Sequence, residues 1–285
     1  MLADLSIRAM CPEDLTFAAQ CTAGEGWVSE NAATLEGFYL YDPAGCLLAE
    51  WAGTPVGICF ATSYGQSGFI GELIVRTEVR GRGIGGALLN CGVDYLRQRG
   101  AQTVYLDGVI KAVPLYERNG FRKVCRSWRF AGRLAGKPHP SVRPMQVADL
   151  PAVFALDRQV FGADRSFFLR RRFELFPKLA RVMLQHGELV GYIEGRCGEG
   201  WVSAGPWIVS EKVSNLAGLL EALACEAGDS WLSLGILEVN LEAVELVHSL
   251  GFSERHDSPW RMALGPPSDL GAAAQCYAVG SAAKG

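Results

Sequence analysis

The sequence predicts a mixed α/β fold (α+β, built on a mixed sheet) that is present in two tandem copies. Three observations support this prediction. The chain resembles itself at an offset of about 135 residues. Each copy alternates strand-like runs with helix-like runs, and a glycine-containing turn in each copy joins neighbouring strands as an antiparallel hairpin.

The internal repeat rests on four short segments that recur in the same order. Ser6–Met10 returns as Ser141–Met145, and Gly53–Gly57 returns as Gly187–Gly191. The other two matches pair Ile74-Val75 with Ile208-Val209, and Ala112, Leu115, Gly120 and Phe121 with Ala243, Leu246, Gly251 and Phe252. We therefore expect a first domain at 1–134, a linker at 135–140 that contains Gly136, Pro138 and Pro140, a second domain at 141–265 and a tail at 266–285.

Each element of the first copy has a local cause. The helix at 84–99 has apolar residues at helical spacing, and Gly120 is expected to stop the short helix at 112–119. The other expected elements are strands at 6–10, 47–51, 56–62, 69–75 and 103–106, helices at 13–20 and 31–39, and an extended run at 121–130. The tail at 266–285 is rich in Ala, Gly and Ser, which is compatible with disorder or with docking across the two halves.

Composition excludes several classes of protein. The chain has 285 residues, of which 49% are hydrophobic and 20% charged, and a net charge of −3, which is typical of a soluble globular protein without a nucleic-acid surface. No signal peptide or membrane span is recognisable, so we expect a cytoplasmic protein that binds no membrane. The nine cysteines are scattered without C-x-x-C pairs or neighbouring histidines, which argues against metal sites and disulfides.

The most informative stretch is Val75–Gly86, which links a strand to a long helix. Its glycines allow close approach of the backbone to a ligand, and the N–H groups at the start of the helix suit a phosphate. Arg76, Arg80 and Arg82 add positive charge. The alternative is a glycine-rich turn with solvated arginines.

A second alternative is a dinucleotide-binding fingerprint. Gly81, Gly83 and Gly86 fit G-x-G-x-x-G literally, and Asp107 follows at about the required 20 residues. However, Arg76–Arg80 separate the strand from the first glycine, and the preceding strands form an antiparallel hairpin. We therefore favour neither nicotinamide nor flavin binding.

The loop Arg80-x-x-Gly83-x-Gly85 after Leu73-x-Val75 resembles the acyl-CoA loop of the GNAT superfamily of N-acyltransferases. Downstream, Ala112-x-x-Leu115-Tyr116-x-x-x-Gly120-Phe121 is similar to the second signature of this family, although Val109 stands where an Asn is usual. Glu25-Gly26-Trp27, Leu106–Val109 and Tyr277–Gly285 resemble a subgroup of bacterial tandem-GNAT proteins. The chain is thus expected to hold two tandem GNAT-like domains.

This resemblance implies an N-acyltransferase that uses acetyl-CoA or another acyl-CoA as co-substrate. Backbone groups of Leu73, Ile74 and Val75 would hold the pantetheine and the acyl carbonyl. The pyrophosphate would be held by Arg80, Gly81, Arg82, Gly83, Ile84, Gly85 and Gly86. Tyr116 is the expected general acid for the leaving thiolate; its alternative is a packed aromatic residue.

The acceptor we expect is a small-molecule amine, which is protonated at neutral pH, so that a carboxylate is needed to bind it and relay its proton. The resemblance to the tandem-GNAT subgroup points to Asp107 and Glu25, and the position on the strand before the loop points to Glu72; the alternative for each is a solvated or capping carboxylate. We expect Asp107 and Glu72 to be catalytic, and Glu25 to bind the acceptor together with Trp27, without a metal.

The second copy has lost these features. Ser214–Leu219 stands in place of the loop, with Leu219 at the position of Gly85 and no arginine, and Val247 replaces Tyr116. We expect copy two to keep the fold without the chemistry. The competing functions are a non-catalytic acyl-CoA sensor and a protein N-acetyltransferase.

Overall fold

The computed structural model describes the whole chain except residues 1–3, 28–30, 199, 211–212, 214 and 267–269. It divides into two compact units. Unit 1 comprises residues 1–124, 261–268 and 284, and unit 2 comprises residues 125–260, 269–283 and 285.

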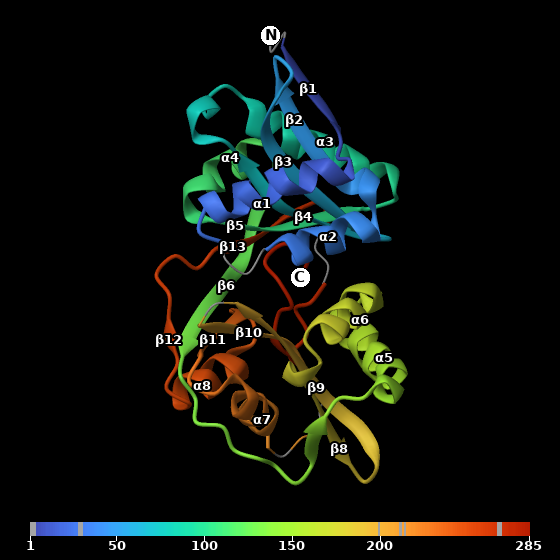
Figure 1. Ribbon diagram of the computed structural model, residues 1–285, viewed down its shortest axis with the longest axis vertical. Helices are drawn as coiled ribbons and strands as arrows, with labels where there is room; N and C mark the ends of the chain where they lie inside the picture. The colour runs from blue at the N-terminus through green and yellow to red at the C-terminus, as the bar shows by residue number, and fades with distance from the viewer. Residues whose placement is uncertain (1–3, 28–30, 199, 211–212, 214, 267–269) are drawn as a thin grey trace. The chain divides into compact units, whose positions relative to one another are not determined.

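Unit 1 is a mixed sheet with helices on both faces (Figure 1). Its strands are β1 (Leu5–Ala9), β2 (Cys46–Trp51), β3 (Thr54–Tyr64), β4 (Ser67–Val75), β5 (Thr103–Gly108) and β13 (Trp260–Leu264), in the order β1-β2-β3-β4-β5-β13. Its helices are α1 (Leu15–Gly24), α2 (Ala32–Tyr41), α3 (Ile84–Gln98) and α4 (Val113–Arg118). Strands β1 to β4 pair antiparallel, whereas β4 and β5 are parallel, so the expected mixed sheet is confirmed.

Neighbouring residues of β3 face opposite helices, because side chains alternate along a strand. Phe60 contacts Phe38 of α2, with 5.1 Å between the ring centroids. Cys59 faces the other way, toward Gly92 of α3, where a Cβ atom would lie 3.3 Å from its sulfur. The sheet therefore has an apolar layer on each face.

Strand β4 bulges in its second half. Its register against β3 shifts between Ile58 and Phe60, and Glu72 takes a left-handed φ of 47°. Among the described residues, strands β4 and β5 pair over Ser67–Phe69 and Thr103–Tyr105 and no farther. Beyond these residues β4 has β3 as its paired neighbour, which leaves the other edge of Leu73–Val75 facing the gap between β4 and β5.

Unit 2 repeats this plan with its own strands and helices (Figure 1). The strands are β6 (Arg122–Gly132), β7 (Val142–Pro144), β8 (Ala180–Gln185), β9 (Glu188–Gly198), β10 (Trp201–Val209), β11 (Trp231–Leu237), β12 (Ser253–Glu254) and β14 (Cys276–Ala278). The helices are α5 (Leu150–Phe161), α6 (Ser166–Leu175), α7 (Gly218–Ala227) and α8 (Leu241–Ser249). The sheet order is β6-β11-β10-β9-β8-β7, with β12 beside β6 and β14 beside β10.

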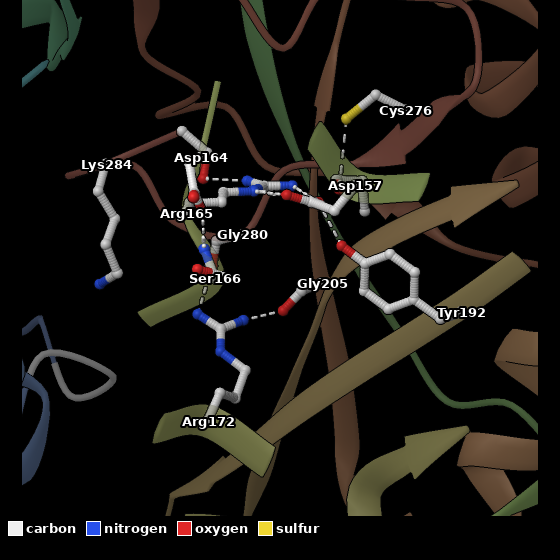
Figure 2. A network of polar contacts seen from close by, with 12 residues as sticks. Asp157, Asp164, Arg165, Ser166, Arg172, Tyr192, Gly205, Cys276, Gly280 and Lys284 are labelled. Atoms are coloured by element: carbon white, nitrogen blue, oxygen red, sulfur yellow. Dashed lines mark hydrogen bonds and ion pairs between the residues drawn. The ribbon is translucent and has the colours of Figure 1, made fainter. Parts of the chain in front are cut away.

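Each face of the unit 2 sheet has an apolar core, and one of them also has a buried polar cluster. Ile193 of β9 belongs to an apolar core with Leu219 and Leu223 of α7. On the opposite face, the Arg165 guanidinium binds the Asp157 carboxylate at 2.8 Å, and the hydroxyl of Tyr192 donates to the same carboxylate (Figure 2). A buried polar cluster thus lies under β9.

The units exchange their last strands. Residues 261–264 of β13, which follow helix α8 of the second copy in sequence, belong to unit 1, and residues 125–132 of β6 belong to unit 2. The boundaries of these compact units therefore differ from those of the predicted domains, 1–134 and 141–265. The predicted domains describe the two copies of the repeated sequence and remain a prediction. Tandem copies alone do not require such an exchange, because each strand pairs with whichever sheet edge it reaches.

Candidate active site

The glycine loop of unit 1 has the backbone conformation that its sequence suggests. Gly81 and Gly83 adopt left-handed φ values of 79° and 84°, which favour glycine. Gly83 is the N-cap of α3, and the first helical hydrogen bond runs from Ala87 N to Gly83 O at 3.1 Å. The N–H groups of residues 84–86 at the start of α3 are therefore available for an anion.

The arginines of this loop lie on its surface. Arg80 donates from Nε to the carbonyl of Val75 at 2.8 Å, and its Nη2 contacts Oε1 of Glu25. Arg82 lies over the ring of Trp51, 5.7 Å from the centroid. The guanidinium groups of Arg80 and Arg82 are therefore exposed to solvent, where a phosphate group of a ligand can reach them.

Glu25 connects three segments of unit 1. Its other carboxylate oxygen, Oε2, accepts from Lys111 Nζ at 2.8 Å. Burial alone would raise the pKa of Glu25, but the hydrogen bonds from Lys111 and Arg80 outweigh it and lower this pKa. Both carboxylate oxygens of Glu25 thus contact cationic side chains of the chain itself. The sequence predicted that Glu25 binds the acceptor, and it did not predict these two contacts. Trp27, expected beside it, is half-buried and donates its backbone N–H to Thr22 O at 2.9 Å.

Tyr116 lies in the short helix α4 with 7% of its surface exposed. Its ring packs on Gly108, where a Cβ atom would come within 2.8 Å of ring carbon Cε2, so glycine is required there. Burial, with a smaller effect from Cys59, raises the pKa of Tyr116. The phenol is therefore protonated at neutral pH, as a general acid must be, although the raised pKa makes donation more costly.

Glu72 sits on the bulge of β4 with 5% of its surface exposed. Burial raises the pKa of Cys59, and the nearby Cys91, Cys46 and Glu72 add to this effect. Cys59 lies near enough to both Glu72 and Tyr116 to be coupled to each in titration, so the two expected catalytic groups share this neighbour.

Asp107 forms a buried ion pair that the sequence did not reveal. Nε of Arg261 lies 2.5 Å from Oδ1 of Asp107, and the two side chains are 2% and 0% exposed. Arg261 also lies over the ring of Phe69, 4.9 Å from its centroid. The one signal in the sequence that Arg261 has a buried partner is that it is the single charged residue in the apolar run 260–264.

The dinucleotide alternative does not fit this geometry. A 3₁₀ turn, Thr77–Val79, separates β4 from Gly81, and β2, β3 and β4 form an antiparallel meander. Among the described residues there is no group of three or more His, Cys, Asp or Glu side chains suited to a metal ion. The same residues include no helix that is both long and apolar enough to cross a membrane.

Two GNAT family models match the chain. The model described as "Acetyltransferase (GNAT) family" matches residues 13–121, and the one described as "Acetyltransferase (GNAT) domain" matches residues 153–278. Together they cover most of the sequence and both predicted copies. The chain belongs to the GNAT acetyltransferase family.

Known proteins add detail to this assignment. A mycothiol acetyltransferase of Thermobispora bispora is 39% identical over 107 residues, which cover 34% of this chain and 36% of that protein. The match thus spans about a third of the length of that relative.

Solved structures share the fold over nearly the whole chain. A putative acetyltransferase of Pyrococcus horikoshii has a TM-score of 0.83 at 23% identity, over 99% of this chain and 96% of that one. A tandem GNAT protein from the clavulanic acid biosynthesis pathway has a TM-score of 0.63 at 15% identity, over 93% and 100%. The tandem-GNAT fold expected from the sequence is confirmed.

Proposed function

We propose that this chain is an N-acetyltransferase in which unit 1 binds acetyl-CoA and transfers its acetyl group to a primary amine of a small molecule. The observation that supports this most directly is the divergence of β4 from β5 after Phe69, beside the left-handed loop at Gly81 and Gly83. A gap with one free backbone edge and an anion-binding helix start at its end suits an extended ligand that carries phosphates.

The residues present fit acetyl-CoA. The free edge of Leu73–Val75 offers backbone groups to the pantetheine, and residues 80–86 offer helix N–H groups and two exposed arginines to the pyrophosphate. Acetyl-CoA supplies an activated thioester and a thiolate leaving group. Val109 lacks the amide of the usual Asn, so this unit relies on its backbone at that point.

Proton transfers fall to two buried side chains. Glu72, on the bulge of β4 next to Leu73–Val75, removes a proton from the ammonium group of the acceptor, directly or through water, and the resulting free amine attacks the thioester carbonyl. Tyr116 keeps its proton at neutral pH and donates it to the thiolate as the C–S bond breaks. Asp107 is already paired with Arg261, so we assign it the role of fixing Arg261 rather than that of a base.

The acceptor class is supported by the relatives. The name mycothiol acetyltransferase indicates a small-molecule acceptor for the Thermobispora bispora protein. A small primary amine is the corresponding proposal for this chain.

Thermal unfolding with saturating acetyl-CoA tests the cofactor. At 100 times the dissociation constant, a ligand adds about 2.7 kcal/mol to the stability, which raises the midpoint by roughly 5 to 10 °C. NADH and ATP serve as controls. A rise with acetyl-CoA alone leads to an amine panel monitored by release of CoA, whereas a rise with NADH alone contradicts the proposal.

A further inference from the structure

The strands of unit 2 diverge at the same place as those of unit 1. Strands β10 and β11 pair in parallel over Trp201–Ser203 and Trp231–Ser233, as β4 and β5 do over Ser67–Phe69 and Thr103–Tyr105. The repeat equates Ile208-Val209 with Ile74-Val75. Unit 2 therefore contains a counterpart of the gap in which unit 1 is proposed to hold acetyl-CoA.

This second gap holds the C-terminal segment of the chain. Strand β14 pairs antiparallel with β10, with Ala278 opposite Trp207 and Cys276 opposite Ile208. Val209 N donates to Gln275 O at 3.1 Å. The segment thus hydrogen-bonds to the edge of β10 that corresponds to Leu73–Val75 of unit 1.

The same segment also bonds to the other side of the gap. Val279 N donates to Gly235 O of β11 at 2.8 Å. A Cβ atom on Gly235 would lie 2.8 Å from Cγ2 of Val279, so the missing side chain makes room for this approach. Residues 276–279 are each at most 7% exposed. The gap is therefore filled by peptide.

Polar side chains of unit 2 hold the backbone of this segment. Nδ2 of Asn240 donates to the carbonyls of Ala274 and Cys276 at 2.8 and 3.0 Å. Farther along, Arg172 Nη2 donates to Gly280 O at 2.8 Å, as Figure 2 shows. Arg165, which Asp157 holds in place, donates to Gly285 O at 2.9 Å. Asn240 occupies the position at which unit 1 has Val109.

We propose that residues 274–280 are a built-in peptide ligand of unit 2, added as a strand in the slot whose counterpart in unit 1 takes acetyl-CoA. The chain accordingly binds one acyl-CoA, in unit 1. The identity of the slot rests on the proposed function, whereas the binding of the peptide does not. The bulky Leu219 and the lack of arginine in 214–219 agree with a slot that no longer serves phosphates.

Hydrogen–deuterium exchange of the intact chain tests whether residues 274–280 stay bound in the slot, and it needs no cofactor. The amides of Val209 and Val279 are expected to exchange slowly, and equally slowly with millimolar acetyl-CoA present. Asn240→Asp keeps the oxygen that caps α8 at Ala243 N but removes the amide donor, so exchange at Val279 should become at least tenfold faster. Asn215→Ala, in the same unit, is the matched control and should leave exchange at Val279 unchanged.

Calorimetric titration with acetyl-CoA tests whether the chain binds a single acyl-CoA, in unit 1. One molecule per chain is expected for the natural sequence, and none for Gly85→Leu, which copies Leu219 into the loop of unit 1. Slow exchange of the α3 amides shows that this variant is folded.

A stoichiometry of two, residual binding of one molecule by folded Gly85→Leu, or acceleration of Val279 exchange by acetyl-CoA would overturn the proposal. If the natural chain binds no acetyl-CoA, the proposed function fails, and the exchange of Val279 alone decides whether the peptide is bound.

Discussion

Arg261 and Asp107 form an ion pair, with Nε and Oδ1 2.5 Å apart, although 154 residues separate them in sequence. The pair joins β13 to β5 inside unit 1. It fixes the end of the strand that borders the proposed acetyl-CoA gap.

Breaking this pair on one side should destabilise the protein strongly. Arg261→Met leaves the Asp107 carboxylate buried without its cation, which costs about 3 to 5 kcal/mol. The double variant Arg261→Met/Asp107→Leu removes both charges and should recover much of that loss. Urea unfolding measures both values, and equal destabilisation of the single and double variants would contradict this view of the pair.

Tyr116→Phe should lower kcat while leaving the affinity for acetyl-CoA unchanged. Loss of a general acid costs about 10²- to 10⁴-fold in rate. The phenyl ring keeps the packing against Gly108, so stability should hardly change. Steady-state kinetics with CoA detection provides the measurement, and an unaltered kcat removes Tyr116 from the mechanism.

Glu25→Gln should strengthen acetyl-CoA binding. Arg80 and Lys111 contact the Glu25 carboxylate, whose lowered pKa keeps it ionised at neutral pH, so a bound phosphate has to compete with it. Because the guanidinium is partly exposed, the gain is about fivefold, equivalent to about 1 kcal/mol.

Calorimetry compares this variant with Glu78→Gln, which affects the exposed Arg76 pair on the same loop. The same competition should also weaken in the natural chain as the pH falls through the lowered pKa of Glu25. Weaker binding by Glu25→Gln would show that the carboxylate supports the site rather than competing for it.

Glu194 should make the protein less stable as the pH rises. It is fully buried, neither oxygen has a hydrogen-bond partner among the described residues, and burial raises its pKa from 4.5 to about 8. Between these values the unfolded state releases the proton while the folded state keeps it, so stability falls by about 1.4 kcal/mol per pH unit.

Urea unfolding at pH 5, 7 and 9 checks this dependence. Glu194→Gln should flatten the decline and be more stable than the natural chain at pH 9, whereas the exposed control Glu188→Gln should retain it. An unchanged decline in Glu194→Gln would assign the pH dependence to other groups.

The fragment 1–134 should not fold on its own. Unit 1 includes residues 261–268, so this fragment lacks the strand that borders β5. Calorimetry should show no cooperative transition for the fragment alone and a restored one when residues 135–285 are co-expressed. A fragment that unfolds cooperatively at the midpoint of the intact chain would contradict the strand exchange.

Local patterns were sufficient to predict most elements. The apolar spacing predicted a helix at 84–99, and α3 is Ile84–Gln98; the run predicted at 103–106 is β5, Thr103–Gly108. The conformation of the glycine loop was likewise predictable, because left-handed backbone positions and the start of a helix favour particular residue types. These features depend on neighbours in sequence.

Features that depend on distant pairing were not predictable. Arg261 lies in a short apolar run whose composition gives no indication that it faces Asp107. Within the tail, for which both disorder and docking across the two halves were compatible with the sequence, β14 forms because β10 and Asn240 offer hydrogen-bond partners to its backbone. The bulge at Glu72 depends on the mismatch with β3, which the sequence of β4 alone does not contain.

The exchanged strand β13 also bears on how such a gene can change. Its codons lie between those of α8 and those of β14, so a truncation of the gene within the second copy would also remove the last strand of unit 1. Point substitutions in the second copy carry no such penalty while its sheet still forms. A duplicated gene of this design can therefore accumulate substitutions in its second half, but it cannot be truncated there without the loss of a strand from the first.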